Sequence, residues 1–228
     1  MGTRKRMNLL MVLNVADIVL YIRNFTDAWT FWALCSTSTK MKDYKYRYLI
    51  WCLNVEASLL YASDKEFREK VCSRMSSVGN QLHIRLEDAD YVADVSALGG
   101  VLYVGLSGQE YVTDVSALGR VKHLDLSYCY GVTDVSMLGQ EAAYSLDLSC
   151  CPNVYSVAAL HRLHTLNLCG CGVEDVSMLG KVYHLCLAEC LSVTDVSALG
   201  SVHTLSLHGC TGITDVSALG SVKVLDLS

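Results

Sequence analysis

Pairs of apolar residues separated by one residue recur along the last two thirds of the chain. Successive pairs begin 19 to 22 residues apart, at Ile84/Leu86, Val104/Leu106, Leu124/Leu126, Leu146/Leu148, Leu166/Leu168, Leu185/Leu187, Leu205/Leu207 and Leu225/Leu227. A fixed period of about 20 residues with one such pair per unit is typical of a solenoid. The sequence therefore predicts about eight stacked strands between residues 81 and 228.

The unit 121–138 shows how each repeat is expected to fold. Successive side chains of a strand point to opposite sides, so Leu124 and Leu126 should point inward and their polar neighbours outward. After a turn, Cys129 should return to the interior, followed by three more apolar residues, Val132, Val135 and Leu138. This second stretch is too short for a full α-helix and favours 3-10 turns or extended chain on the convex side, with Thr133 and Asp134 able to cap the turn.

The repeat LxLxxCxxVTDVSxL resembles the leucine-rich-repeat family in its cysteine-bearing form, and its VTDVSALG segment is similar to the short-helix repeats of internalin-type proteins. The resemblance covers residues 81–228. It implies an α/β solenoid: a right-handed stack of about eight parallel strands with 3-10 or extended convex segments, preceded by a small α-helical N-terminal domain. One unit departs from the pattern, with Ser156 in place of the usual aspartate and the only proline, Pro152, which is compatible with a bend in the stack.

Cysteine occupies one interior position in five successive repeats: Cys129, Cys151, Cys171, Cys190 and Cys210. A free cysteine in such a place behaves as a small hydrophobe. The chain has 11 cysteines, and the others show no paired spacing at the domain ends of the kind that secreted repeat proteins use. This usage favours a reducing compartment, so we expect an intracellular protein, cytoplasmic or nuclear.

The formal net charge of −5 combines a basic and an acidic region. Residues 1–80 contain 12 Lys and Arg against 7 Asp and Glu, whereas residues 81–228 contain 6 against 16. An acidic repeat region disfavours nucleic-acid binding, which needs a positive surface. The basic, tyrosine-rich run at 42–48 has the composition of a nucleic-acid site, but a solvated helix face is the simpler interpretation. We expect no nucleic-acid partner.

Apolar residues at helical spacing in residues 8–41 indicate short helices. A helical cap over the open end of the solenoid is one interpretation. Residues 17–41 also resemble an F-box, although the opening Leu-Pro of that family is absent and Thr26 replaces an expected leucine. This resemblance implies binding to the F-box linker subunit of a cullin-type ubiquitin ligase through five side chains in register, Ile18, Ile22, Phe25, Phe31 and Leu34. F-boxes followed by leucine-rich repeats are familiar in substrate receptors, and similar proteins occur in large DNA viruses of protists.

These patterns divide the chain into three predicted regions: an F-box-like helical domain at 1–45, a helical linker and N-terminal cap at 46–80, and a leucine-rich-repeat domain at 81–228. Within the linker, Ser63 to Glu66 has the pattern of a capping box and predicts a helix through about Arg74. The last predicted strand has no capping segment after it, which suggests a longer gene or a covering partner.

A membrane partner is not expected. Arg4, Lys5 and Arg6 precede an apolar run and loosely resemble the start of a signal peptide, but Asn8 and Asp17 interrupt or close that run and no cleavage site follows. The segment is also too short and too polar to span a bilayer.

Outward strand positions are expected to line the concave face, where such solenoids usually bind their partners. Neighbours in each column of this face should lie about 4.8 Å apart. We select as candidates for binding a target protein the residues His83, Arg85, Tyr103, His123, Asp125, Asp147, Thr165, Asn167, His184, Cys186, Thr204, Ser206 and His208.

Metal binding and catalysis are the alternatives for this face. His184, Cys186 and Cys169 are candidates for a zinc site, but zinc needs three or four ligands in tetrahedral geometry, and scattered histidines on a solvated sheet are the simpler interpretation. Combinations of Ser, His and Asp are unavoidable in a repeat built from those residues. We therefore predict no metal, no cofactor and no enzymatic activity.

Two functions remain. The first is a non-enzymatic adaptor, in which residues 1–45 dock the linker subunit of a cullin-type ubiquitin ligase and the concave face holds a target protein. The basic charge of residues 1–80 suits the acidic linker subunit of that family. The second is a leucine-rich-repeat scaffold whose N-terminal helices only cap the solenoid and that takes no part in ubiquitin transfer.

Overall fold

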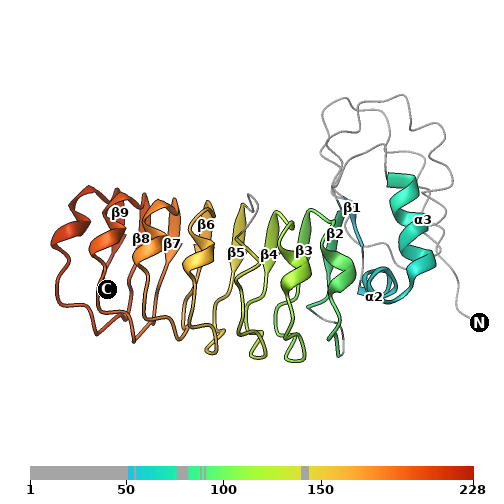
Figure 1. Cartoon of the computed structure of the whole chain (residues 1–228), viewed down its shortest axis with the longest axis horizontal. Helices are drawn as coiled ribbons and strands as arrows, with labels where there is room; N and C mark the ends of the chain where they lie inside the picture. Colours follow the sequence, from blue (N-terminus) through green and yellow to red (C-terminus); the bar gives the residue numbers. More distant parts are fainter. Residues whose placement is uncertain (1–50, 54, 76–81, 88, 90, 140–143) are drawn as a thin grey trace, which may run out of the picture.

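The computed structural model describes residues 51–228 except 54, 76–81, 88, 90 and 140–143 (Figure 1). Within these residues, one parallel sheet contains nine short strands in the order of the sequence. The strands are β1 Trp51–Cys52, β2 Leu82–Arg85, β3 Tyr103–Gly105, β4 His123–Asp125, β5 Ser145–Asp147, β6 Thr165–Asn167, β7 His184–Cys186, β8 Thr204–Ser206 and β9 Val224–Asp226. The eight strands predicted from the repeats are β2 to β9, and β1 is an addition that the repeat pattern did not predict.

The strands pair in the register that the repeat predicts. Leu124 of β4 lies beside Leu146 of β5, which in turn lies beside Leu166 of β6. The backbone hydrogen bonds continue beyond each strand, as in the bond from the Leu106 N–H to the Asp125 carbonyl oxygen at 2.8 Å. We call one turn of the solenoid, formed by one repeat, a coil. Since every coil is hydrogen-bonded to the next, the sheet is continuous from β1 to β9.

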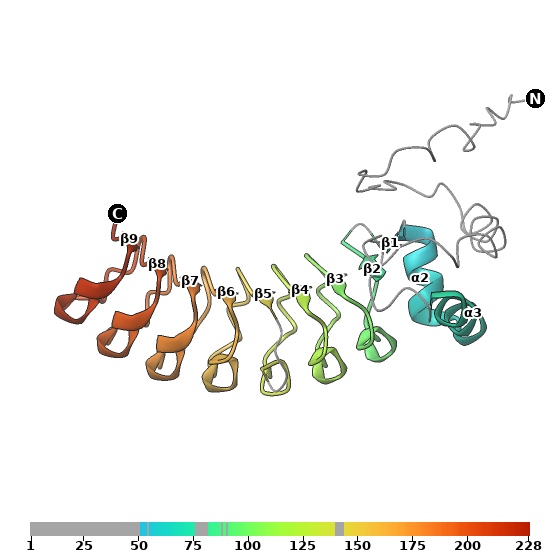
Figure 2. The same cartoon turned by 90° about the horizontal axis from the view of Figure 1, so that it is seen from above.

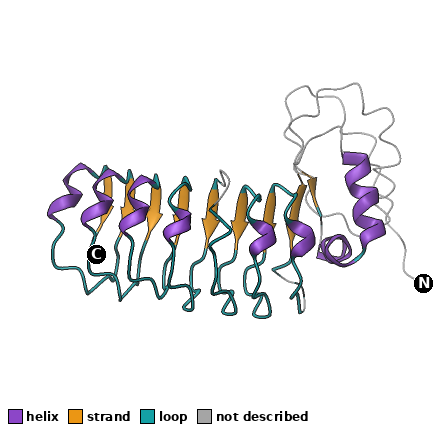
Figure 3. Cartoon of the chain, viewed as in Figure 1, coloured by secondary structure: helices purple, strands orange, loops and turns teal. Residues whose placement is uncertain are grey.

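A short 3-10 helix follows six of the strands and lies on the opposite side of the coil (Figure 3). These helices are η3 Ser96–Leu98, η4 Ser116–Leu118, η5 Ala158–Leu160, η6 Ser177–Lys181, η7 Ser197–Ser201 and η8 Ser217–Ser221. Seen from above, the stack is an arc with the strands on its concave side and the 3-10 helices on its convex side (Figure 2). The wider convex side accommodates the bulkier helical turns, as the sequence predicts.

An aspartate orients most of the convex turns. In six repeats its Oδ1 accepts a hydrogen bond from the backbone N–H of the serine two residues later, at 2.8 to 2.9 Å, as in Asp94 with Ser96 and Asp195 with Ser197. This bond satisfies an N–H that has no partner within the turn. The hydrogen bonds with the serine lower the pKa of the carboxylate, as at Asp195. The aspartate therefore holds the start of the turn, as predicted, but it does so from one position before the N-cap, which is a valine.

Leucine, valine and cysteine side chains fill the space between the two sides of the coil. Leu126, Leu148 and Leu168 are fully buried rungs of one core that extends from Leu53 to Leu219. In the cysteine column, each Sγ donates to a carbonyl oxygen of the preceding repeat, as Cys151 does to Leu126 at 3.1 Å. Burial raises the pKa of Cys151 to about 11, so the thiol stays protonated and serves as a donor. The interior position predicted for this column is confirmed.

Gln109 replaces cysteine in the repeat that contains β3. Its side-chain amide donates to the carbonyl oxygens of Leu86 and Ala89, at 2.5 and 2.8 Å, and its oxygen accepts from the Val92 N–H. The longer amide therefore satisfies three backbone groups where a thiol satisfies one carbonyl. A polar residue is tolerated in this buried place because all its groups are paired.

Two helices precede the repeats, α2 Val55–Ser63 and α3 Lys65–Met75. Ala57, Tyr61, Phe67 and Val71 extend the repeat core, and the Ser58 hydroxyl oxygen accepts a hydrogen bond from the Arg85 N–H of β2. These two helices thus pack against the first coil. No helix in the described part of the chain is long and apolar enough to cross a membrane.

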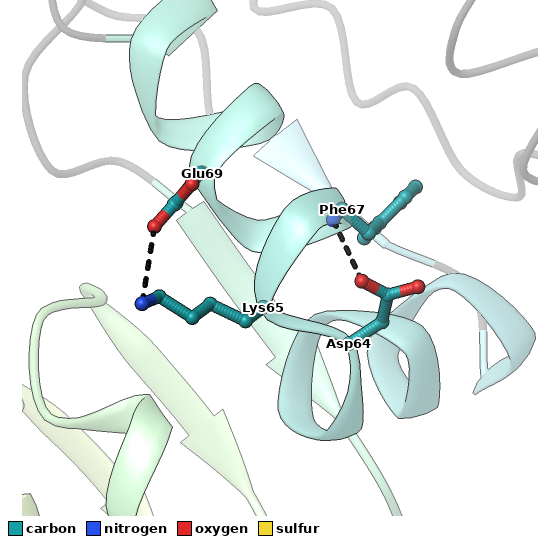
Figure 4. Close-up of polar contacts among 4 residues, drawn as sticks. All are labelled: Asp64, Lys65, Phe67 and Glu69. Atoms are coloured by element: carbon teal, nitrogen blue, oxygen red, sulfur yellow. Dashed lines mark hydrogen bonds and ion pairs between the residues drawn. The ribbon is translucent and has the colours of Figure 1, made fainter.

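The helix predicted from residue 63 is present, but its N-cap lies one residue later (Figure 4). Asp64 caps α3, since its Oδ1 accepts from the Phe67 N–H at 3.0 Å, while the Ser63 hydroxyl donates back to the Leu59 carbonyl of α2. The predicted serine cap was wrong because α2 continues through Ser63 and uses its side chain. Lys65 and Glu69 form an exposed ion pair along α3, with Nζ 3.7 Å from Oε1.

The residue immediately before the interior cysteine adopts a left-handed backbone conformation. Glycine stands there in some repeats, as at Gly209 with φ of 71°, and a larger residue in others, as at Glu189 with φ of 57°. A side chain costs about 1 kcal/mol in this conformation. We therefore expect Gly209→Ala to destabilise the fold by about 1 kcal/mol and Glu189→Gly to leave it unchanged or more stable, measured by urea unfolding. Equal destabilisation by both substitutions would contradict the explanation that a side chain is strained at this left-handed position.

Candidate functional site

The predicted binding columns lie in register on the concave side of the sheet. The first column aligns His83, Tyr103, His123, Thr165, His184 and Thr204 with Ser145 and Val224, through the strand pairs β2 to β9. The second aligns Arg85, Asp125, Asp147, Asn167, Cys186 and Ser206 with Gly105 and Asp226. The structure therefore brings the candidates of these two columns together on one face. That these columns bind a target remains a prediction.

Hydrogen bonds between neighbouring strands hold several of these side chains. The His123 Nδ1 lies 2.8 Å from the Ser145 hydroxyl, and the Asn167 amide donates to the Asp147 Oδ2 at 3.0 Å. His208, which lies two residues beyond Ser206 and outside these two columns, has its Nδ1 2.9 Å from the Ser228 hydroxyl. Side chains that are already oriented lose less conformational entropy when a partner binds. The face is thus a partly ordered polar surface.

An aromatic and cationic group lies at the β2 end of the face. The His83 and Tyr103 rings stack with centroids 5.0 Å apart, and the Arg85 guanidinium carbon lies 5.6 Å from the centre of the Tyr103 ring. Burial, the Arg85 charge and His123 lower the pKa of His83 from 6.5 to about 4. His83 is therefore neutral near pH 7 and accepts or donates hydrogen bonds without carrying charge.

Acid is expected to weaken the fold through His83. Because the pKa of His83 is about 4 in the folded chain and about 6.5 when the ring is solvated in the unfolded chain, the unfolded chain binds the proton first. The free energy of unfolding that depends on a neutral His83 is fully present above pH 6.5 and is lost as the pH falls toward 4. The loss is about 1 kcal/mol after solvent screening of this half-exposed ring. Thermal unfolding of His83→Gln should show a shallower pH dependence in this window. An unchanged slope would contradict this assignment.

A row of stacked rings, which the sequence reasoning missed, borders the first column. The side chains of Tyr144, His164, Tyr183 and His203 lie at the position before each outward strand residue, and we call them the aromatic ladder. Successive ring centroids are 4.6, 4.9 and 4.4 Å apart, with interplanar angles of 10°, 22° and 10°. The available signal was the recurrence of aromatic residues at one position of four successive repeats.

His184 supports the ladder from the first column. Its ring meets Tyr183 edge-on, with centroids 4.7 Å apart, and lies 5.3 Å from the His164 ring. His123 makes a tilted contact with Tyr144 at 5.4 Å. Edge-to-face contacts of this kind are favourable and fix ring orientation. Two of the predicted candidates therefore belong to an aromatic network as well as to the polar face.

Among the described residues, no three His, Cys, Asp or Glu side chains are arranged to hold a metal ion. All nine cysteines whose state the structure describes are free thiols. A depression on the convex side is lined by Glu174, Asp175 and Asp195, but the two aspartates already accept hydrogen bonds from Ser177 and Ser197. The concave face therefore remains the candidate site.

The predicted linker-binding residues Ile18, Ile22, Phe25, Phe31 and Leu34 lie outside the described residues. Their role therefore rests on the sequence resemblance alone. The same holds for the predicted domain at 1–45.

No protein-family model and no curated protein matches the chain. Solved structures of internalins from Listeria monocytogenes do match its fold. Internalin F is 18% identical with a TM-score of 0.50, over 75% of this chain and 61% of that one. Internalin C2 is 20% identical with a TM-score of 0.45, over 68% and 74%. The functional domain of InlJ, which includes a cysteine ladder, is 19% identical with a TM-score of 0.42, over 67% and 40%.

The match spans 61% of the internalin F chain and 40% of the InlJ chain, and at these identities it concerns the fold only. The likeness to internalin F agrees with the geometry described above: parallel strands in register, 3-10 turns on the convex side, and a leucine core. The predicted solenoid is confirmed, and the repeat region of this chain has the leucine-rich-repeat fold of the internalins.

Proposed function

We propose that this protein is an interaction scaffold that binds a protein partner on its concave face. The observation that carries the proposal is the unbroken parallel sheet from β1 to β9, whose outward side chains lie in aligned rows. An extended, concave, polar surface of this kind is what solenoids use to bind proteins. The leucine-rich-repeat fold is typically a binding platform rather than an enzyme. The candidate residues are those selected from the first and second columns, together with His208.

Two substitutions that each add a positive charge test the face. Asn167→Arg places a large cation among Asp125 and Asp147 on the concave side, and Ser197→Arg places the same side chain on the exposed convex side. Proteins captured by the unmodified chain should be retained by the convex variant and lost by the concave variant. Equal capture by both variants, with both folded by circular dichroism, would reject the concave face as the binding site.

The finer proposal is that the partner is a protein marked for ubiquitination and that the chain is a receptor of a cullin-type ligase. It is supported by the F-box resemblance of residues 17–41 and by the basic charge of residues 1–80. We further propose an intracellular location, cytoplasmic or nuclear, which the free thiols support.

Co-purification of the chain with an F-box linker subunit tests this finer proposal. The double variant Ile22→Asp/Leu34→Asp should abolish binding to the linker subunit. The Asn167→Arg variant, which alters only the concave face, should retain that binding. If the unmodified chain does not bind the linker subunit, the alternative holds: a leucine-rich-repeat scaffold outside the ubiquitin system. The capture experiment on the concave face is independent of that result.

A further inference from the structure

The faces of the rings in the aromatic ladder are largely occupied by one another. His164 is stacked between Tyr144 and Tyr183, and Tyr183 is stacked between His164 and His203, with centroid distances below 5 Å. A base or a sugar that stacks on an aromatic residue needs a free ring face. The ladder therefore presents ring edges, rather than ring faces, to a partner.

The exposed edges carry hydrogen-bond donors. Tyr144 is 51% exposed and Tyr183 is 42% exposed, so both phenol rings reach solvent although their faces are stacked. The phenol hydroxyl and the imidazole N–H are donors, and the rim of an aromatic ring is the positive part of its quadrupole. A row of such edges attracts carboxylates rather than cations.

Basic residues are concentrated on the same edge of the solenoid. Residues 81–228 contain 6 Lys and Arg, and five of them lie at the end of a convex turn or in the short link from that turn to the next strand: Arg120, Lys122, Arg162, Lys181 and Lys223. Lys122 and Lys223 stand at the ladder position itself, one repeat before Tyr144 and one repeat after His203. The ladder is thus bounded by a cation at each end.

The acidic residues of the repeats lie elsewhere. In the links between residues 99 and 223, Glu141 is the one acidic residue, whereas residues 81–228 contain 16 in total. The second column of the concave face carries Asp125 and Asp147, so the charge changes from basic to acidic across the strands. A nucleic-acid backbone lying on this surface would meet those carboxylates. This charge pattern favours a narrow acidic partner aligned along the ladder.

We propose that the ladder, with Lys122 and Lys223, is the docking strip for an acidic segment of the partner protein. The strip has six repeat positions and spans roughly 24 Å at about 4.8 Å per strand, the length of about 16 helical residues. Carboxylates of the segment accept hydrogen bonds from the ring edges and pair with the flanking lysines. This inference rests on the proposed function and names the chemistry of the partner.

A glutamate-rich peptide of about 16 residues, labelled with a fluorophore, is the probe. Its binding to the full chain is compared by fluorescence anisotropy with that of a glutamine-matched peptide and of a thymidine oligonucleotide. We expect the glutamate peptide to bind at least about tenfold tighter than either of them, with affinity that falls as salt is added. Equal binding of the two peptides, or tighter binding of the oligonucleotide, would overturn the proposal.

Two variants and one control locate the binding. Tyr144→Ala/Tyr183→Ala removes alternate rungs of the ladder, and Lys122→Gln/Lys223→Gln removes the flanking charges while leaving the rings. Each should weaken binding of the glutamate peptide about tenfold. The control, Tyr91→Ala/Tyr111→Ala, removes an exposed tyrosine pair from turns that follow β2 and β3, with centroids 5.4 Å apart, and should bind as the unmodified chain does.

The lysine variant keeps the test decisive if the tyrosine variant does not fold, because Lys223 is exposed, Lys122 is only half-buried, and neither belongs to the core. Unchanged peptide binding by the lysine variant would overturn the docking strip. The proposed function has a separate readout: if the peptide does not bind but Asn167→Arg still loses the captured protein, the strip is rejected and the concave scaffold stands. If the peptide does not bind and Asn167→Arg also keeps the captured protein, both the docking strip and the concave scaffold are rejected.

Discussion

Leu168→Ala is expected to lower the free energy of unfolding by about 3 kcal/mol. Leu168 is fully buried and is one of the core rungs, between Leu148 and Leu187 of the neighbouring coils. Truncation leaves a cavity that the flanking coils fill only in part, because each coil is held to its neighbours by backbone hydrogen bonds. In a repeat stack the loss also weakens the coupling between the two halves.

Urea unfolding followed by circular dichroism measures this effect. Thr204→Ala is the matched control, since Thr204 points outward from β8, and its free energy of unfolding should change by no more than about 0.5 kcal/mol. A loss below about 1 kcal/mol for Leu168→Ala would mean that the coils do not share a continuous core.

Gly180→Ala is expected to destabilise the fold by about 2 kcal/mol. A Cβ at Gly180 would lie 2.2 Å from the carbonyl oxygen of Ala198 in the next coil. A backbone oxygen cannot move without displacing η7, so the clash separates two coils that otherwise pack closely. The destabilisation arises from contact between repeats and not from the conformation of the glycine itself.

Gly220 provides a matched control for Gly180, since both follow the same Ser-x-Leu segment of the repeat. A Cβ at Gly220 meets nothing within 4 Å. Gly220→Ala should therefore be neutral or slightly stabilising through reduced entropy of the unfolded chain. If both substitutions lower the free energy of unfolding by the same amount in urea, the effect is local to the helix. The explanation by close contact between neighbouring repeats would then be wrong.

The repeat region could be predicted from sequence because two patterns determine it: the repeat length of about 20 residues and the alternation of apolar and polar residues within each strand. Leu124 and Leu126 differ from His123 and Asp125 in polarity, and a strand places such neighbours on opposite sides. The cysteine column followed from the same register. The agreement extends to the convex turns, where the aspartate of six repeats accepts a hydrogen bond from the backbone N–H of the serine that follows it by two residues.

Other features depend on contacts that the alternation does not encode. Tyr144 and His164 stand just before the strands, where the period of two does not say which way a side chain points, so their stacking emerged only from the geometry of the coils. The cap of α3 shifted from Ser63 to Asp64 because α2 continues one residue further than the motif implied. Strand β1 has no leucine pair and joins the sheet through pairing with β2.

Site-specific photocrosslinking tests the central claim, that the concave face binds a protein partner, most directly. A photoreactive residue is placed at Thr165, an outward position of β6, or at Met178, an exposed position in η6 on the convex side. The account predicts a covalent protein adduct from position 165 and none from position 178. Adducts from position 178 alone would contradict it, since the partner would then lie on the convex side.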